Sequence, residues 1–192
     1  MAGRDHGSTP RHVKLTYDEY VHFPDDGMRH ELIDGEHFVT PSPNTRHQRI
    51  SQRLSMAIGT WLADHPTGEL FCAPFDVVFT RFDVVEPDLI YVSHEHKATW
   101  LTVQHAIGAD LVIEIGSPST RTRDETIKRE LYERAGVAEY WFVDPDNNLV
   151  RVYSRAADAL EAVLELSAAR EEELNTALLP GFRLSLEKLF GE

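Results

Sequence analysis

The sequence predicts an α/β domain, because apolar segments typical of buried strands alternate with segments of helical periodicity. Residues 110–115 are almost wholly apolar, as expected of a strand at the centre of a sheet. Residues 45–64 instead place apolar side chains three and four positions apart, as an amphipathic helix does. The chain has 192 residues, of which 42% are hydrophobic, so it can bury a core as one domain. We expect that domain to span 15–192, after a flexible N-terminal segment, 1–14.

Local signals mark the elements of the N-terminal half. Glu19 follows Thr16 at the spacing of a capping box, which predicts the start of a short helix. An Asp-Gly pair predicts a tight turn between the two strands of a hairpin over 31–39. The helix over 45–64 then presents one apolar stripe. Its members are Ile50, Leu54, Ile58, Trp61 and Leu62.

Strands are predicted over 70–80 and 88–92, because both segments are rich in apolar and β-branched residues. A loop is expected over 94–97. The single cysteine, Cys72, lies within an apolar run and is expected to be a small buried thiol. One cysteine cannot form an internal disulfide, which suits a reducing cytoplasm.

The C-terminal half continues the alternation of strands and helices. A helix is predicted over 122–135, because its start has capping-box spacing and a glycine follows its end. Strands over 139–143 and 149–153 flank a loop rich in Asp, Asn and Pro. The tail is expected to add a strand or two and a final short helix, 186–190.

Composition limits the possible functions. The formal net charge of −13 argues against the large basic surface that nonspecific nucleic-acid binding usually needs. The sequence contains no run of about 18 apolar residues that could span a bilayer. The N-terminus lacks the apolar core of a secretory signal, so we expect a cytoplasmic protein that does not enter a membrane. Positive charge gathers on one face of the helix over 45–64, in Arg46, Arg49 and Arg53.

Two carboxylates and one lysine are candidates for catalysis. Asp88 begins one apolar strand and Glu114 lies near the end of another, while Lys128 lies in the helix that follows. Carboxylate oxygens bind Mg²⁺ or Mn²⁺, and a lysine stabilises charge that develops on a phosphate. Each residue has a plainer interpretation: Asp88 as a turn residue, Glu114 as a strand end in water, and Lys128 as a solvated side chain.

The spacing within the predicted helix favours the catalytic interpretation of Lys128. Asp124, Lys128 and Tyr132 are four residues apart and share one helix face, beside an apolar face. That apolar face consists of Ile127, Leu131 and Ala135. Because this helix follows the Glu114 strand after a short loop, we expect Lys128 to reach the Glu114 carboxylate.

Two further residues have open roles. Glu31 is a third metal ligand or an ordinary carboxylate at the edge of a hairpin. His47 contacts phosphate or assists proton transfer, or it is bonded structurally in the first turn of its helix. The sequence has no Gly-x-Ser-x-Gly elbow, phosphate-binding glycine loop or zinc-ligand spacing, so those classes of site are not expected.

Several segments together resemble the Uma2 family of restriction endonucleases, which belongs to the PD-(D/E)xK nuclease superfamily. The resemblance runs from about Leu15 to Phe190. The segments that carry it are 31–36, 41–43, 86–89, 112–114, 117–120 and 135–144.

This resemblance implies the restriction-endonuclease-like fold, a mixed central β-sheet flanked by helices. It also implies that Asp88, Glu114 and the Ile115 carbonyl hold Mg²⁺ or Mn²⁺, with Glu31 as an extra metal ligand. The superfamily lysine usually stands two residues after the glutamate, where this chain has Gly116. Lys128 is then the expected replacement, since a long flexible side chain can bring the same charge from another backbone position.

The implied function is metal-dependent hydrolysis of phosphodiester bonds in nucleic acid, with DNA as the first expectation. Asp124 and Tyr132 would position Lys128, and a homodimer would serve to cut two strands. The predicted contacts to backbone phosphates are Arg46, Arg49 and Arg53. Two alternatives remain: a catalytically silent nuclease fold that acts as a binding or assembly module, and a metal-dependent hydrolase of a smaller phosphorylated substrate.

Overall fold

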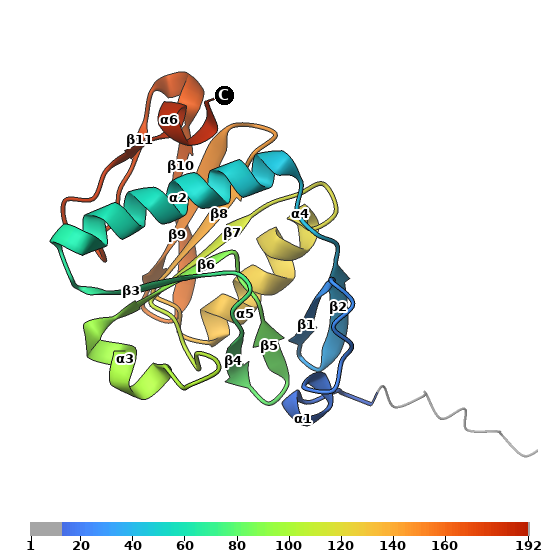
Figure 1. Ribbon diagram of the computed structural model, residues 1–192. Helices are drawn as coiled ribbons and strands as arrows, with labels where there is room; N and C mark the ends of the chain where they lie inside the picture. Colours follow the sequence, from blue (N-terminus) through green and yellow to red (C-terminus); the bar gives the residue numbers. More distant parts are fainter. Residues whose placement is uncertain (1–12, 192) are drawn as a thin grey trace, which may run out of the picture.

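A six-stranded mixed sheet forms the centre of the protein (Figure 1). The computed structural model describes residues 13–191, apart from the side chains of residues 162 and 163. All but the last two residues of the predicted flexible segment, 1–14, therefore lie outside the described residues. Strands β7 and β8 are parallel and the other pairs are antiparallel, which confirms the mixed sheet. Its order is β10 (Ala159–Ser167), β9 (Leu149–Ala156), β8 (Glu139–Asp144), β7 (Leu111–Ile115), β6 (Leu89–Ser93) and β3 (Gly68–Cys72).

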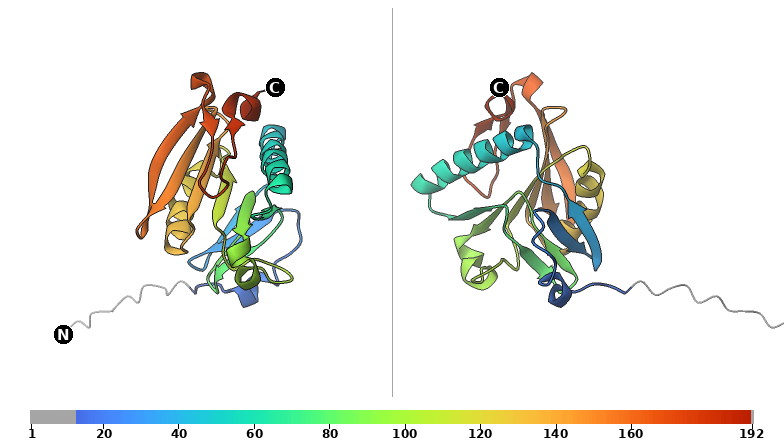
Figure 2. Two further views of the ribbon diagram at one scale, coloured as in Figure 1. Left: turned by 90° about the vertical axis from the view of Figure 1, so that its left-hand side faces the viewer. Right: turned by 45° about the vertical axis from the view of Figure 1, so that its right-hand side comes forward.

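Helices cover both faces of this sheet. Helix α2, Thr45–Asp64, lies on one face and α5, Arg129–Arg134, on the other (Figure 2). Because side chains alternate along β7, Ile113 belongs to the core cluster that contains Ile50 of α2, whereas Val112 belongs to the one that contains Leu131 of α5. The strand is buried on both sides, as its apolar sequence predicted.

The helix predicted over 122–135 is present but irregular. It begins with α4, Arg121–Arg123, passes through a π-helical turn, Asp124–Lys128, and continues as α5. The predicted apolar face is wrong at Ile127, which is 38% exposed. An extra residue in a π turn shifts the side chains around the helix axis, so Asp124 and Lys128 are turned inward instead.

A smaller, four-stranded sheet lies on the α5 side of the protein (Figure 1). The hairpin is confirmed: its turn residues Asp34 and Gly35 have φ values of 52° and 75°, which suit a tight turn. Phe79 of this sheet packs against Tyr132 of α5, with ring centroids 6.0 Å apart. The strand order is β2 (Glu36–Thr40), β1 (Arg29–Ile33), β5 (Asp83–Val85) and β4 (Val77–Thr80).

Three local predictions are wrong. The segment 70–80 forms two strands, β3 and β4, in different sheets, because Pro74 between them has no N–H for a continuous ladder. Cys72 is exposed rather than buried, because it ends β3 at the open edge of the large sheet. The loop expected over 94–97 is helix α3, His94–Trp100, in which the His96 ring stacks on Trp100 and bonds to Asp110.

The remaining elements lie at the two ends of the described chain. The predicted first helix is α1, Tyr17–Tyr20, where the Glu19 carboxylate accepts a hydrogen bond from the Thr16 backbone N–H at 2.8 Å. The tail forms a 3₁₀ turn (Ala168–Arg170), the paired strands β11 (Glu173–Leu174) and β12 (Leu184–Ser185), and helix α6 (Leu186–Phe190). None of the helices within residues 13–191 is long and apolar enough to cross a membrane.

Candidate active site

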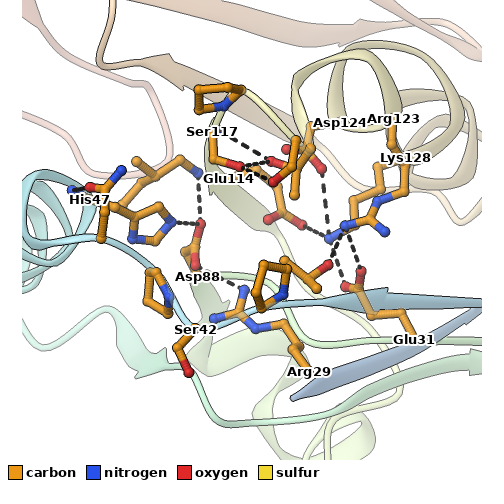
Figure 3. A pocket seen from close by; sticks show the side chains of 18 residues that line it. Arg29, Glu31, Ser42, His47, Asp88, Glu114, Ser117, Arg123, Asp124 and Lys128 are labelled. Carbon is orange, nitrogen blue, oxygen red and sulfur yellow. Dashed lines mark hydrogen bonds and ion pairs between the residues drawn. The ribbon is translucent and has the colours of Figure 1, made fainter. Parts of the chain in front are cut away.

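Asp88 and Glu114 project from the same face of the large sheet. Leu89 of β6 lies opposite Ile113 of antiparallel β7, so one step further Asp88 comes opposite Glu114. Directly opposed residues of an antiparallel pair point to the same side. Both residues are only 3% exposed, and both line one pocket (Figure 3). The predicted convergence of the two carboxylates is confirmed, and neither residue is a solvated turn or strand end.

The Asp88 carboxylate is held by three donors from three elements. The Ile115 backbone N–H donates to Oδ2 at 2.8 Å, and His47 Nε2 of α2 lies 3.1 Å from the same oxygen. Arg29 Nη1 of β1 lies 3.0 Å from Oδ1. Burial alone would raise the pKa of Asp88, but His47, Arg29 and the Ile115 N–H lower it below its ordinary value. Asp88 is therefore ionised at neutral pH.

The Glu114 carboxylate bonds to the α5 side of the site. Lys128 Nζ lies 2.8 Å from Oε1, and the Tyr132 hydroxyl donates to that same oxygen, which leaves Oε2 outside both bonds. Burial raises the pKa of Glu114 to about 8, although the Lys128 ammonium opposes this rise. The two carboxylates thus differ: Asp88 is held in its ionised form, whereas Glu114 gains a proton readily.

Lys128 is the buried cation of the site, with 1% of its surface exposed. Its Nζ lies 2.6 Å from Glu31 Oε1, 2.8 Å from Glu114 Oε1 and 4.0 Å from Asp124 Oδ1. Burial lowers a lysine pKa, but these carboxylates outweigh it and raise the pKa of Lys128. Figure 3 shows the ammonium between Glu31 and Glu114. The prediction that Lys128 reaches Glu114 from the following helix is confirmed.

Asp124 and Tyr132 were both expected to position Lys128, but only Asp124 faces its ammonium. Tyr132 bonds to Glu114 rather than to Lys128, so it orients the carboxylate. Asp124 faces Lys128 from the preceding turn, and burial raises the pKa of Asp124 to about 6 against the opposing effect of Lys128.

Glu31 is completely buried, so it is not a solvated carboxylate at the edge of a hairpin. Its Oε1 accepts from the Glu86 backbone N–H at 3.1 Å in addition to Lys128. Within the described chain, Glu31 Oε2 and Asp124 Oδ1 are buried oxygens with no hydrogen-bond partner. Arg123 Nη2 is 3.6 Å from that Glu31 oxygen, which is an ion-pair distance.

Two site residues were missed in the sequence. Arg29 and Arg123 line the pocket together with Lys128, opposite four carboxylates. Arg29 stands two residues before Glu31, and this period of a strand was a usable signal that the two share a face. Arg123 had no comparable signal, because its approach to Glu31 depends on how the hairpin packs against the helix.

The arginines predicted to contact phosphates do not line this pocket. Arg46 Nη2 donates to Asn148 Oδ1 at 2.6 Å, and Arg53 Nη1 donates to the Leu189 carbonyl at 3.0 Å. Arg49 is exposed along α2. Their phosphate contacts remain a prediction.

The donor set suits a hard divalent cation that takes few protein ligands. Within residues 13–191, no three His, Cys, Asp or Glu side chains lie where they could hold a metal ion by themselves. Mg²⁺ does not need such a cage, because it binds one or two carboxylates and keeps water and phosphate as its other ligands. Asp88 and Glu114 supply two carboxylates on one face, and the Glu31 and Asp124 oxygens that accept no hydrogen bond add negative potential beside them. The residues present therefore fit a divalent cation.

The fold is shared with a solved structure. A crystal structure from Anabaena variabilis, described as "a putative nuclease belonging to DUF820", matches with a TM-score of 0.77. The match covers 92% of this chain and 97% of that chain at 20% identity, so it shows the fold alone. No curated protein matches the chain.

The sequence comparison identifies the family. The family model that matches carries the description "Putative restriction endonuclease" and covers residues 17–187. Asp88, Glu114 and Lys128 all lie within that match. The chain belongs to the Uma2 family.

Proposed function

We propose that this protein is a metal-dependent nuclease that hydrolyses phosphodiester bonds in nucleic acid. The observation that carries the proposal is the convergence of Asp88, Glu114 and Lys128, from three different elements, in one pocket. Two carboxylates on one face can hold a divalent cation, and an ammonium beside them can stabilise charge on a phosphate, which are the two parts that metal-dependent phosphodiester hydrolysis uses.

In this proposal, Asp88, Glu114 and the Ile115 carbonyl hold Mg²⁺ or Mn²⁺, and Glu31 belongs to a second metal position or a proton relay. A bound divalent cation lowers the pKa of a water molecule and polarises a phosphoryl oxygen. Lys128 orients the attacking water or stabilises the charge that develops on phosphorus. His47 fixes the Asp88 carboxylate through Oδ2.

The charge of the pocket supports a requirement for the cation. Its lining contains four carboxylates, Glu31, Asp88, Glu114 and Asp124, against the three cations Arg29, Arg123 and Lys128. With every one of these groups ionised, this leaves a formal excess of one negative charge, which repels a phosphate, and protonation of Glu114 would cancel it. One divalent ion reverses that sign, so phosphate binding and metal binding should support each other.

One observation favours the catalytically silent alternative. Lys128 is held by both Glu31 and Glu114, and Arg29 is held by Asp88, so each cation is already paired. A nuclease needs these pairs to loosen when substrate and metal bind. A binding module would keep them.

The decisive experiment is a cleavage assay with purified protein on plasmid DNA, single-stranded DNA and RNA, in Mg²⁺ or Mn²⁺. The parent should cut at least one of these, and Asp88→Asn, Glu114→Gln and Lys128→Ala should each lower the rate by about a hundredfold or more. Chelation of the metal should stop cleavage by the parent.

Asp110→Asn provides a matched control. Asp110 is also a buried aspartate, 6% exposed, but it precedes β7 at the end opposite to Glu114. This variant should lose stability and keep its cleavage rate per folded molecule. Cleavage that survives all three site variants would refute the assignment of the site. If the parent cuts no nucleic acid in either metal, the nuclease proposal fails.

A further inference from the structure

Asp88 lies in a wall shared by two adjoining cavities. The first chamber is the catalytic pocket, of about 230 Å³. The second chamber, of about 380 Å³, is also lined by Met28, the residue before β1, and by Gln48 of α2. Both chambers are lined by Arg29, His47 and Asp88, and also by the segment 40–43. The groove thus continues on either side of the proposed scissile position.

The catalytic groups lie at the bottom of this groove rather than on the surface. Asp88 and Glu114 are each 3% exposed and Lys128 is 1% exposed. A phosphate must therefore enter the groove to reach them. The phosphates of a duplex lie on its outside, but a duplex is stiff and cannot bend sharply enough to place one phosphate at the bottom of such a groove. A flexible strand can bend into such a groove with one neighbouring nucleotide in each chamber.

Electrostatics point the same way. A duplex has one negative charge per about 1.7 Å of its axis, and its binding requires several Lys or Arg contacts to phosphates. The chain has a net charge of −13, and the arginines of α2 lie outside both chambers. Two of them, Arg46 and Arg53, already bond to other parts of the protein. A single strand carries a lower charge density, so its repulsion is smaller.

We propose that the substrate is single-stranded nucleic acid, with the scissile phosphate at Asp88 and Arg29 and a flanking nucleotide in each chamber. This rests on the proposed nuclease function. Because one strand is cut, one active centre is sufficient, and the cleavage rate should be proportional to protein concentration.

The test compares one labelled oligonucleotide in three forms: alone, annealed to its full complement, and annealed to a complement that leaves its central part unpaired. With Mg²⁺ or Mn²⁺, the free strand and the unpaired region should be cut about tenfold faster or more than the full duplex. Binding is measured separately, by fluorescence anisotropy, with Glu114→Gln in Mg²⁺. That variant should bind the free strand more tightly than the duplex.

Two tryptophan variants test the second chamber. Gln48 is exposed and lines only that chamber, so Gln48→Trp should slow cleavage of the single strand by about tenfold. Gln52 is exposed one turn further along α2 and lines neither chamber, so Gln52→Trp should match the parent. Both substitutions are at exposed helix positions, and equal unfolding midpoints would show that folding is unaffected.

The outcomes separate this inference from the proposed function. Equal cleavage of duplex and single strand would refute the inference and leave the nuclease function standing. Equal rates for Gln48→Trp and Gln52→Trp would refute the use of the second chamber. Hydrolysis of only a small phosphodiester such as bis(p-nitrophenyl) phosphate would overturn the inference in favour of a smaller substrate. If no substrate is cut, the proposed function fails. If Glu114→Gln also binds the free strand and the duplex with equal affinity in the anisotropy measurement, the preference for a single strand is rejected as well.

Discussion

The Phe142 ring occupies the space that any side chain at position 116 would need. A Cβ built on Gly116 would lie 2.6 Å from Phe142 Cζ and 2.8 Å from Cε2. Phe142 belongs to β8 and is completely buried, so it cannot move into solvent. This packing explains why the lysine expected two residues after Glu114 is absent, and why a cation must come from another element.

We therefore predict that Gly116→Ala destabilises the protein by about 1–3 kcal/mol, the usual cost of overpacking a core. Gly59 of α2 is the control, because a Cβ there meets nothing within 4 Å. Gly59→Ala should stabilise the protein by up to about 1 kcal/mol, since alanine favours the helix. Urea unfolding measures the change in unfolding free energy for both variants. Equal and small effects at the two positions would contradict the role of Phe142.

Removal of the buried ammonium should have a larger effect. Lys128→Met keeps the length of the side chain but leaves Glu31 and Glu114 buried without their cation. The expected loss is about 3–5 kcal/mol of unfolding free energy, as when one member of a buried ion pair is removed. Lys97→Met is the control, because Lys97 forms an exposed pair with Glu69, and it should cost less than about 1 kcal/mol.

The unfolding free energy that Lys128→Met loses relative to the parent should also depend on pH. Burial raises the pKa of Glu114 in the parent, and removal of Lys128 raises it further. A carboxyl group whose folded pKa exceeds its unfolded pKa binds protons on folding, so stability falls as pH rises. Below about pH 8, Glu114 is protonated in both folded proteins, so the deficit of Lys128→Met should be constant there. It should grow above about pH 8, where Glu114 of the parent loses its proton and Glu114 of the variant does not. A deficit that stays constant above about pH 8 would mean that lost packing, not unpaired charge, causes it.

The sequence predicted the central elements well, because their signals are local. The apolar run 111–115 and the stripe on α2 depend on periodicity alone, and both were confirmed. The loop expected over 94–97 was wrong for a different reason. Trp100 and Asp110 stabilise α3 through tertiary contacts with His96, and no propensity reveals them.

The sequence predicted those site residues that lie at strand ends or match the family pattern. Asp88, Glu114 and Lys128 were placed correctly, since the strand register and the following helix bring them together. Arg123 was not predictable, because its position beside Glu31 requires the small sheet to pack against the helix. The π turn at 124–128 also has no sequence signal, although it directs Lys128 inward.

Removal of the Arg29 guanidinium should tighten Mg²⁺ binding and slow cleavage. Its guanidinium pairs with Glu86 at 2.7 Å and with Asp88 at 3.0 Å, so it repels a cation that approaches Asp88. In Arg29→Gln, the Mg²⁺ concentration for half-maximal cleavage should fall. The single-turnover rate at saturating Mg²⁺ should also fall, by about 10 to 100 times, because the proposed contact of Arg29 with the scissile phosphate is lost.

A lower Mg²⁺ requirement together with a lower rate distinguishes this role from a structural one. If Arg29 only held the fold, Arg29→Gln would lower the rate and raise the Mg²⁺ requirement together. Arg183→Gln, at an exposed pair with Glu173 remote from the pocket, should change neither value.

Arg121 and Asp144 should make stability sensitive to acid. Both oxygens of the buried Asp144 accept from Arg121, at 2.5 and 2.6 Å, at the start of the helical segment that carries Lys128. Burial alone would raise the pKa of Asp144, but Arg121 and Asn147 lower it below its ordinary value. A lowered pKa stabilises the folded state above the unfolded pKa, and that contribution is lost as pH falls through the folded pKa.

Arg121→Gln should therefore cost about 1–3 kcal/mol at neutral pH, the range for hydrogen bonds to a charged group. The difference from the parent should shrink below about pH 4 and vanish where Asp144 is protonated in both proteins. Denaturant unfolding across this pH range measures it. A difference that persists unchanged in acid would mean that Arg121 acts through packing. Because the same ion pair anchors the helix start beside residues 117–120 of the pocket, the variant should also lower cleavage at neutral pH.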